Sequence, residues 1–123
     1  MTIAYWCVLV LLFFPPVLGA LAKSGGGFDN SRPRECLAAT TGWRKRADWA
    51  QQNALENFAP FAAAVIIGHQ LGLAQGTLNM LALAYVALRV LHAVFYITNL
   101  AALRSLAYIG GLACIIAIFV MVA

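Results

Sequence analysis

The sequence predicts an all-α fold: an integral membrane four-helix bundle formed by one domain of 123 residues. Apolar residues make up 63% of the chain and charged residues only 10%, with a mean hydropathy of +0.86. A soluble domain of this size cannot bury so much apolar side chain, so lipid must be part of its solvent. The apolar residues also fall into separate stretches of membrane-crossing length, which in a bilayer predicts helices.

The first predicted helix covers residues 3–22, about the length that crosses a bilayer. Pro15 and Pro16 are expected to kink or break it near its middle. A cleaved signal peptide is the alternative, because the small residues at 20–22 resemble a cleavage site. Against that alternative, residues 1–5 carry no positive charge.

Residues 23–42 are predicted to form a loop, because they contain strong breakers at residues 24–27 and 31–33, the latter ending in Pro33, and show no periodicity. The basic residues of this loop either hold it in the cytoplasm or bind lipid headgroups. The three cysteines, Cys7, Cys36 and Cys114, have a spacing that suits neither a disulfide framework nor a zinc site, so we expect no metal. A nucleic-acid partner is not expected either, since the net charge of +4 has no soluble basic face to carry it.

Three further helices are predicted at residues 43–69, 77–98 and 100–122. The first of them begins with polar turns and ends apolar, and Pro60 is placed to bend it between the two parts. Residues 68–76 form an uncharged turn, and a short hinge near Asn99 leads into the last helix. Gly110 and Gly111 would allow that helix to pack closely against a neighbour.

Four crossings put both charged connections on one side of the membrane and the uncharged 68–76 turn and both termini on the other. The positive-inside rule then places the charged connections in the cytoplasm. The unusual polar side chains gather at that boundary. They are Arg46, Asn53 and Glu56 from helix 43–69, Arg89, His92 and Tyr96 from helix 77–98, and Arg104 from helix 100–122.

This set holds three arginines but one carboxylate, and ionisable groups inside a membrane are expensive unless paired. Glu56 can pair with one arginine, which leaves a surplus of positive charge suited to an anionic ligand with carboxylates. A small zwitterionic peptide would match this inventory. In addition, Arg104 beside a helix N-terminus would lower the pKa of a bound thiol. The alternatives are that Arg46 and Arg104 extend to lipid headgroups and that Arg89 and Glu56 form a structural pair.

Two motifs resemble the MAPEG family, the membrane-associated proteins in eicosanoid and glutathione metabolism. One is Arg46-x6-Asn53-x2-Glu56-Asn57-x2-Pro60-Phe61, which resembles the second-helix signature of that family. The other is Arg89-x2-His92-x3-Tyr96 followed by Arg104, which resembles its microsomal glutathione transferases. The similarity covers nearly the whole chain.

The resemblance implies a left-handed bundle that assembles as a homotrimer and binds glutathione between subunits at the cytoplasmic boundary. By motif position, the glutathione contacts would be Arg46, Gln51, Asn53, Glu56, Arg89 and Tyr96. Arg104 would be the catalytic arginine that stabilises the thiolate. A lipophilic electrophile would reach the sulfur from the membrane lipid, and no metal would be needed.

The sequence departs from the family pattern at Trp49, where glutathione-using members commonly carry a second arginine. The expected activity is conjugation or reduction of a lipophilic electrophile with glutathione. The alternative is a non-catalytic protein of the same fold that binds a lipid headgroup or another anionic metabolite, which Trp49 favours. A small exporter of cationic drugs would need a carboxylate within residues 3–22, and that stretch has none.

Overall fold

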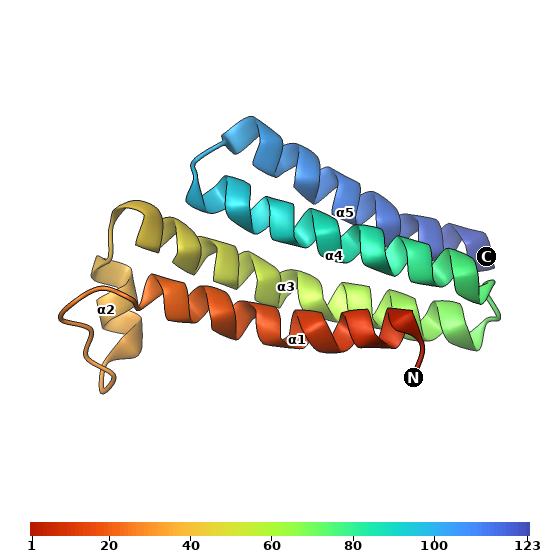
Figure 1. Ribbon diagram of the computed structural model, residues 1–123, viewed down its shortest axis with the longest axis horizontal. Coiled ribbons are helices and arrows are strands. Elements are labelled where there is room, and N and C mark those ends of the chain that lie inside the picture. The colour runs from red at the N-terminus through yellow and green to blue at the C-terminus, as the bar shows by residue number, and fades with distance from the viewer.

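A computed structural model describes residues 1–123 and contains five helices and no strands. Four long helices lie lengthwise beside one another, and one short helix sits at an end of them (Figure 1). The helices are α1 (Ile3–Ala22), α2 (Pro33–Ala39), α3 (Gly42–Gln70), α4 (Gln75–Ile97) and α5 (Ala101–Val122). The predicted all-helical class is confirmed.

Three of these helices, α1, α4 and α5, are long and apolar enough to cross a membrane. Their outward faces carry exposed large apolar side chains such as Phe13, Leu83 and Ile109, which suit contact with lipid. Helix α3 differs because its first half is polar, although it lies alongside the other three over their length (Figure 1). The polar half of α3 is where the candidate site forms.

The long helices begin and end within two residues of the predicted bounds, but the predicted loop at residues 23–42 contains a helix, α2. The prediction took Pro33 as a breaker, whereas here it occupies the first position of a helix. Proline is well suited to that position, because its φ angle is already helical and its missing N–H has no intrahelical partner there. Glu35 adds a favourable negative charge in the first turn.

Pro15 and Pro16 do not break α1, which is one continuous helix of 20 residues. The two prolines remove two backbone donors, so the carbonyls one turn earlier lose their intrahelical partners. Pro15 is buried within the bundle, where packing on the neighbouring helix holds the segment in place. Tertiary packing therefore overrides the local preference.

The core lies among all four long helices and is built from small, aliphatic and aromatic residues. Phe61 of α3 and Tyr85 of α4 stack with ring centroids 4.1 Å apart, and the Tyr85 hydroxyl donates to the Asn57 carbonyl at 3.1 Å. Gly68 of α3 lets Ile118 of α5 approach closely, since a Cβ at Gly68 would lie 2.8 Å from an Ile118 methyl group. These contacts fix α3 against α4 and α5.

The connections between the long helices lie at two opposite ends of the molecule. The α1–α3 connection, including α2, lies at the same end as the turn between α4 and α5, while the α3–α4 turn and both termini lie at the opposite end (Figure 1). Asn99 makes the α4–α5 turn with a φ of 63°, a left-handed conformation that asparagine tolerates better than most residues. The fold thus brings the cation-bearing α1–α3 connection to the same end as the α4–α5 turn and Arg104, which lies in the first turn of α5.

Candidate functional site

A buried arginine forms the inner wall of the site. Arg89 of α4 is only 3% exposed and has no carboxylate partner. One of its terminal nitrogens donates to the Asn53 side-chain oxygen of α3 at 2.6 Å. The same oxygen accepts from the Asn57 amide at 3.3 Å. Burying a charge within a membrane helix costs free energy. The hydrogen bond to the neutral Asn53 side chain offsets part of that cost without cancelling the positive charge.

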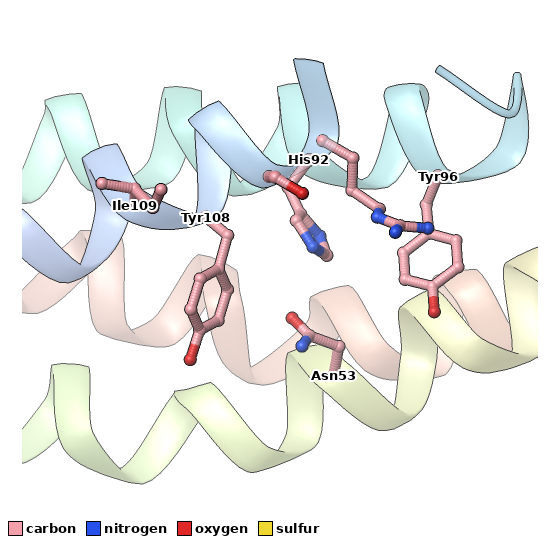
Figure 2. A pocket seen from close by; sticks show the side chains of 7 residues that line it. Asn53, His92, Tyr96, Tyr108 and Ile109 are labelled. Carbon is pink, nitrogen blue, oxygen red and sulfur yellow. The ribbon is translucent and has the colours of Figure 1, made fainter. Parts of the chain in front are cut away.

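A recess of about 380 Å³ lies beside this pair, between α3, α4 and α5. Figure 2 shows Asn53 entering it from α3, His92 and Tyr96 from α4, and Tyr108 from α5. Its lining residues are Asn53, His92, Tyr96, Arg104, Ser105, Tyr108 and Ile109. No carboxylate is among them, so the recess has a net positive character.

Arg104 lies over the face of Tyr96, with its guanidinium carbon 4.4 Å from the ring centroid. This cation–π contact orients the guanidinium, which the first turn of α5 carries. On another side of Tyr96 lies Trp49 of α3, whose ring centroid is 6.4 Å away. Trp49 is 44% exposed, so an aromatic surface occupies the position where the family resemblance led us to expect a second arginine.

His92 supplies an unsatisfied polar atom in the recess. The residue is 3% exposed, and its Nδ1 is buried with no hydrogen-bond partner in the protein. Its ring packs edge-on to Tyr96, at 5.6 Å between centroids, and lies 6.2 Å from Tyr108. A buried polar atom without a partner is destabilising, so the packing around His92 carries a cost that the protein alone does not offset.

Of the six predicted glutathione contacts and the predicted catalytic arginine, the structure brings some together at the recess and places the others elsewhere. Asn53, Tyr96 and Arg104 line the recess, and Arg89 lies behind Asn53. The Nε of Arg46 donates to the Ile97 carbonyl at 3.0 Å, so this side chain holds the C-terminus of α4. No ion pair joins Arg89 to Glu56, which is exposed and has no partner within the chain.

Gln51 is turned away from the recess. Its amide lies over Gly19 of α1, where a Cβ would come within 2.7 Å of the Gln51 nitrogen. Within one chain, Gln51 therefore packs the α1–α3 contact, and Glu56 faces outward. Neither side chain reaches the group formed by Asn53, Tyr96 and Arg104.

The sequence reasoning did not assign Ser105, Tyr108 or Ile109 to the site. A signal was present for Tyr108, because it follows Arg104 by four residues and so shares its helical face. Ser105 and Ile109 enter through the exposed side of α5, which the apolar composition of that helix had marked only as a lipid surface.

The arrangement can bind an anion and stabilise developing negative charge. Arg104 offers a fixed fork of donors, Ser105 a hydroxyl, and Arg89 a positive potential from behind Asn53. No group of three His, Cys, Asp or Glu side chains is close enough to hold a metal ion. Tyr108 and Ile109 line the recess and are exposed, so they give it an apolar border on α5.

Comparison with protein families gives one match: the model of the MAPEG family matches residues 1–123, the whole chain. No curated protein and no solved structure gives a significant match.

Proposed function

Because the chain belongs to the MAPEG family, we propose that it is a membrane-bound glutathione transferase that conjugates or reduces a lipophilic electrophile. It is an integral membrane protein, since three of its helices are long and apolar enough to span a bilayer and its family is one of membrane proteins. In this proposal α3 is the fourth crossing of a four-helix bundle, and the charged connections face the cytoplasm.

The observation that carries the proposal is the recess without carboxylates, with Arg104 on its wall and Arg89 one hydrogen bond behind it. Glutathione has two carboxylates, one ammonium group and a thiol, so it needs more cations than anions around it. Arg89 would attract a carboxylate from behind Asn53, and Asn53 and the His92 ring would contact the peptide on the recess wall. Glu56 and Gln51 would contribute from the exposed and α1-facing sides of α3.

In the proposed mechanism, Arg104 stabilises the thiolate of the bound tripeptide. Each unit by which a nearby cation lowers the pKa of a thiol corresponds to about 1.4 kcal/mol in favour of the thiolate. The thiol proton leaves to solvent, the sulfur attacks the electrophilic carbon, and the leaving group departs with the bonding electrons. Tyr96 positions Arg104 through its ring face, and the Ser105 hydroxyl can donate to the same sulfur.

We propose that the active form is a homotrimer with a neighbouring subunit over the recess. Support comes from Glu56, an exposed carboxylate without a partner on a helix that lies among membrane spans. Such a group is costly against lipid and is expected to be covered by protein or water. A neighbouring chain would supply that cover and would complete the Arg46 and Glu56 side of the site.

Turnover tests this function. Purified protein in lipid nanodiscs is mixed with glutathione and a lipophilic aryl halide, and the thioether product is followed by absorbance. Wild type should exceed the uncatalysed rate, and Arg104→Ala should lose about 100-fold in kcat, as the loss of a transition-state donor does elsewhere. Arg34→Ala removes an exposed cation from α2 and should leave the rate unchanged. A wild type no faster than the uncatalysed reaction would contradict the proposal.

One observation favours a second candidate, a non-catalytic MAPEG-fold protein that binds a lipid headgroup or another anionic metabolite. Trp49 gives the site an aromatic surface beside Tyr96 in place of a further cation, which weakens recognition of a second carboxylate. If this candidate holds, Trp49→Arg should raise glutathione affinity in a calorimetric titration. An unchanged or lower affinity in that variant would remove the reason for preferring it.

A further inference from the structure

A second recess, of about 350 Å³, lies at the end of the molecule where α1 ends and α3 begins. Its walls come from the last residue of α1, the glycine-rich segment that follows, the end of α2 and the first turn of α3. The polar and charged side chains that line it are Lys23, Thr40, Thr41 and Arg44. None of these residues belongs to the recess around Arg104.

The two cations of this second recess have no carboxylate partner. Three of the four acidic residues of the chain are paired elsewhere: Asp29 and Glu35 with Arg32, and Asp48 with Lys45. The fourth, Glu56, lies well along α3 and makes no ion pair. Ser31 donates two hydrogen bonds to Asp29, and these hold the pKa of that carboxyl below its usual value. Asp29 is therefore charged, but its carboxylate is directed toward Ser31 and Arg32 of the same turn.

Arg44 carries a specific unsatisfied donor. Its Nε is buried and has no hydrogen-bond acceptor in the protein. The guanidinium passes over Gly25, where a Cβ would lie only 3.2 Å from that Nε. Its other contact is with the Trp43 ring, 4.9 Å from the guanidinium carbon. Glycine thus leaves room for the guanidinium beside the recess, where the enclosed Nε is left without an acceptor.

The first turn of α3 adds to the positive potential. Thr41 is its N-cap residue but makes no side-chain capping hydrogen bond, and no acidic residue lies in the first turn. The N-terminus of a helix this long favours an anion, because its first amide groups have no intrahelical acceptors. The Thr41 hydroxyl is exposed and free to donate, whereas Thr40 donates to the Cys36 carbonyl at 2.8 Å.

The recess also lies at the edge of the membrane-spanning part. Ala22 lines it and is the last residue of α1, one of the three spans. Phe28 lies beneath the Lys23 ammonium at 5.4 Å, and Trp43 is 39% exposed beside Arg44. Aromatic side chains paired with cations are typical of the depth at which lipid headgroups lie.

We propose that this recess binds the phosphate group of an anionic membrane phospholipid. Lys23 and Arg44 neutralise the phosphate, and the terminal nitrogens of Arg44 and the α3 N-terminus donate to its oxygens. The acyl chains descend along the exposed face of α1. A soluble phosphate shares the same anionic chemistry, but it would not explain the position of the recess directly at the end of a span.

Native mass spectrometry of the full chain in detergent tests the site, with phosphatidylglycerol as the probe and phosphatidylcholine as the uncharged comparison. Wild type should bind phosphatidylglycerol in preference. Lys23→Gln and Arg44→Gln should each weaken this binding at least about fivefold, the effect expected of one cation near an anionic headgroup. Arg34→Gln removes the same charge from an exposed position of α2 outside the recess and should change binding less than twofold.

Equal losses in all three variants would show only general charge attraction and would overturn the proposal, as would equal binding of the two lipids by wild type. Displacement of phosphatidylglycerol by millimolar inorganic phosphate would assign the recess to a soluble phosphate and overturn the lipid source. Lys23 and Arg44 make no ion pairs in the fold, so both variants should fold. Unchanged helix content by circular dichroism checks this directly.

Discussion

Asn53 is the side chain on which the buried charge of Arg89 depends, because its oxygen accepts the 2.6 Å hydrogen bond from that guanidinium. Asn53→Ala should lower the free energy of unfolding by about 2 kcal/mol, since a buried charged donor loses its acceptor. The measurement is an SDS titration in mixed micelles, followed by circular dichroism.

Asn57→Ala is the matched control for this change. It removes a neighbouring side-chain amide one turn along the same helix but leaves the Asn53 oxygen to Arg89. Its effect should be clearly smaller, and Asn53→Asp should keep most of the stability because a carboxylate accepts the same bond. Equal losses for Asn53→Ala and Asn57→Ala would mean that Arg89 does not need this partner.

At the residue scale, the sequence could predict that Asn53, Tyr96 and Arg104 lie together, because each polar position recurs on one face of its helix. It could not predict the roles of Arg46, Gln51 and Glu56. A helical face is broad, so its members meet different neighbours: Arg46 meets the end of α4, while Gln51 meets Gly19. Which neighbour a side chain meets depends on the packing of helices, which periodicity does not contain.

Close approach between α3 and α5 depends on one glycine. Gly68→Ala should lower the free energy of unfolding by about 1–3 kcal/mol, because the new methyl group would overlap the Ile118 side chain. Gly76→Ala is the control, as nothing lies within 4 Å of a Cβ at that helical position. It should leave stability unchanged or raise it by up to about 1 kcal/mol.

The same SDS titration compares the two glycine variants. If Gly68→Ala proves as stable as wild type, the α3–α5 contact has more room than the 2.8 Å between an added Cβ and the Ile118 methyl group implies. A loss in Gly76→Ala equal to that in Gly68→Ala would point instead to a general intolerance of the bundle to alanine.

At the element scale, the long helices were predictable because membrane-length apolar stretches leave few other structures. Helix α2 was not, because proline breaks a helix in its interior but starts one at its first position, and the sequence alone did not show which role Pro33 has. The continuity of α1 through Pro15 and Pro16 has a similar cause: packing of buried Pro15 outweighs two lost backbone bonds.

The positive-inside rule predicts the orientation of the whole molecule in the membrane, because the cation-bearing α1–α3 connection lies at one end and the uncharged α3–α4 turn at the other (Figure 1). In a variant without native cysteines, Asn30→Cys should react with a membrane-impermeant maleimide only after cells are permeabilised. Ala74→Cys, in the opposite turn, should react in intact cells. Both positions are exposed, so labelling reports the side of the membrane. The reverse pattern would contradict the cytoplasmic placement of the charged connections.

The proposed assembly can be measured by native mass spectrometry from lipid nanodiscs. The account predicts a species of three chains, and Glu56→Arg should weaken it, because the variant reverses the charge of an exposed side chain that the neighbouring subunit is proposed to cover. Thr77→Arg, on α4 near the opposite end, is a control that should leave the assembly intact. A monomer as the only species of wild type would contradict the trimer.

Composition predicted the membrane class at this scale, but stoichiometry depends on surface complementarity between chains, which hydropathy does not encode.

Formation of a glutathione thiolate on the protein tests the central claim most directly. Glutathione is titrated into purified protein in detergent, and thiolate absorbance in the ultraviolet is compared for wild type, Arg104→Ala and the control Arg34→Ala. The account predicts a saturable rise in wild type and in Arg34→Ala that disappears in Arg104→Ala. No saturable rise in wild type up to millimolar glutathione, or an equal rise in Arg104→Ala, would contradict it.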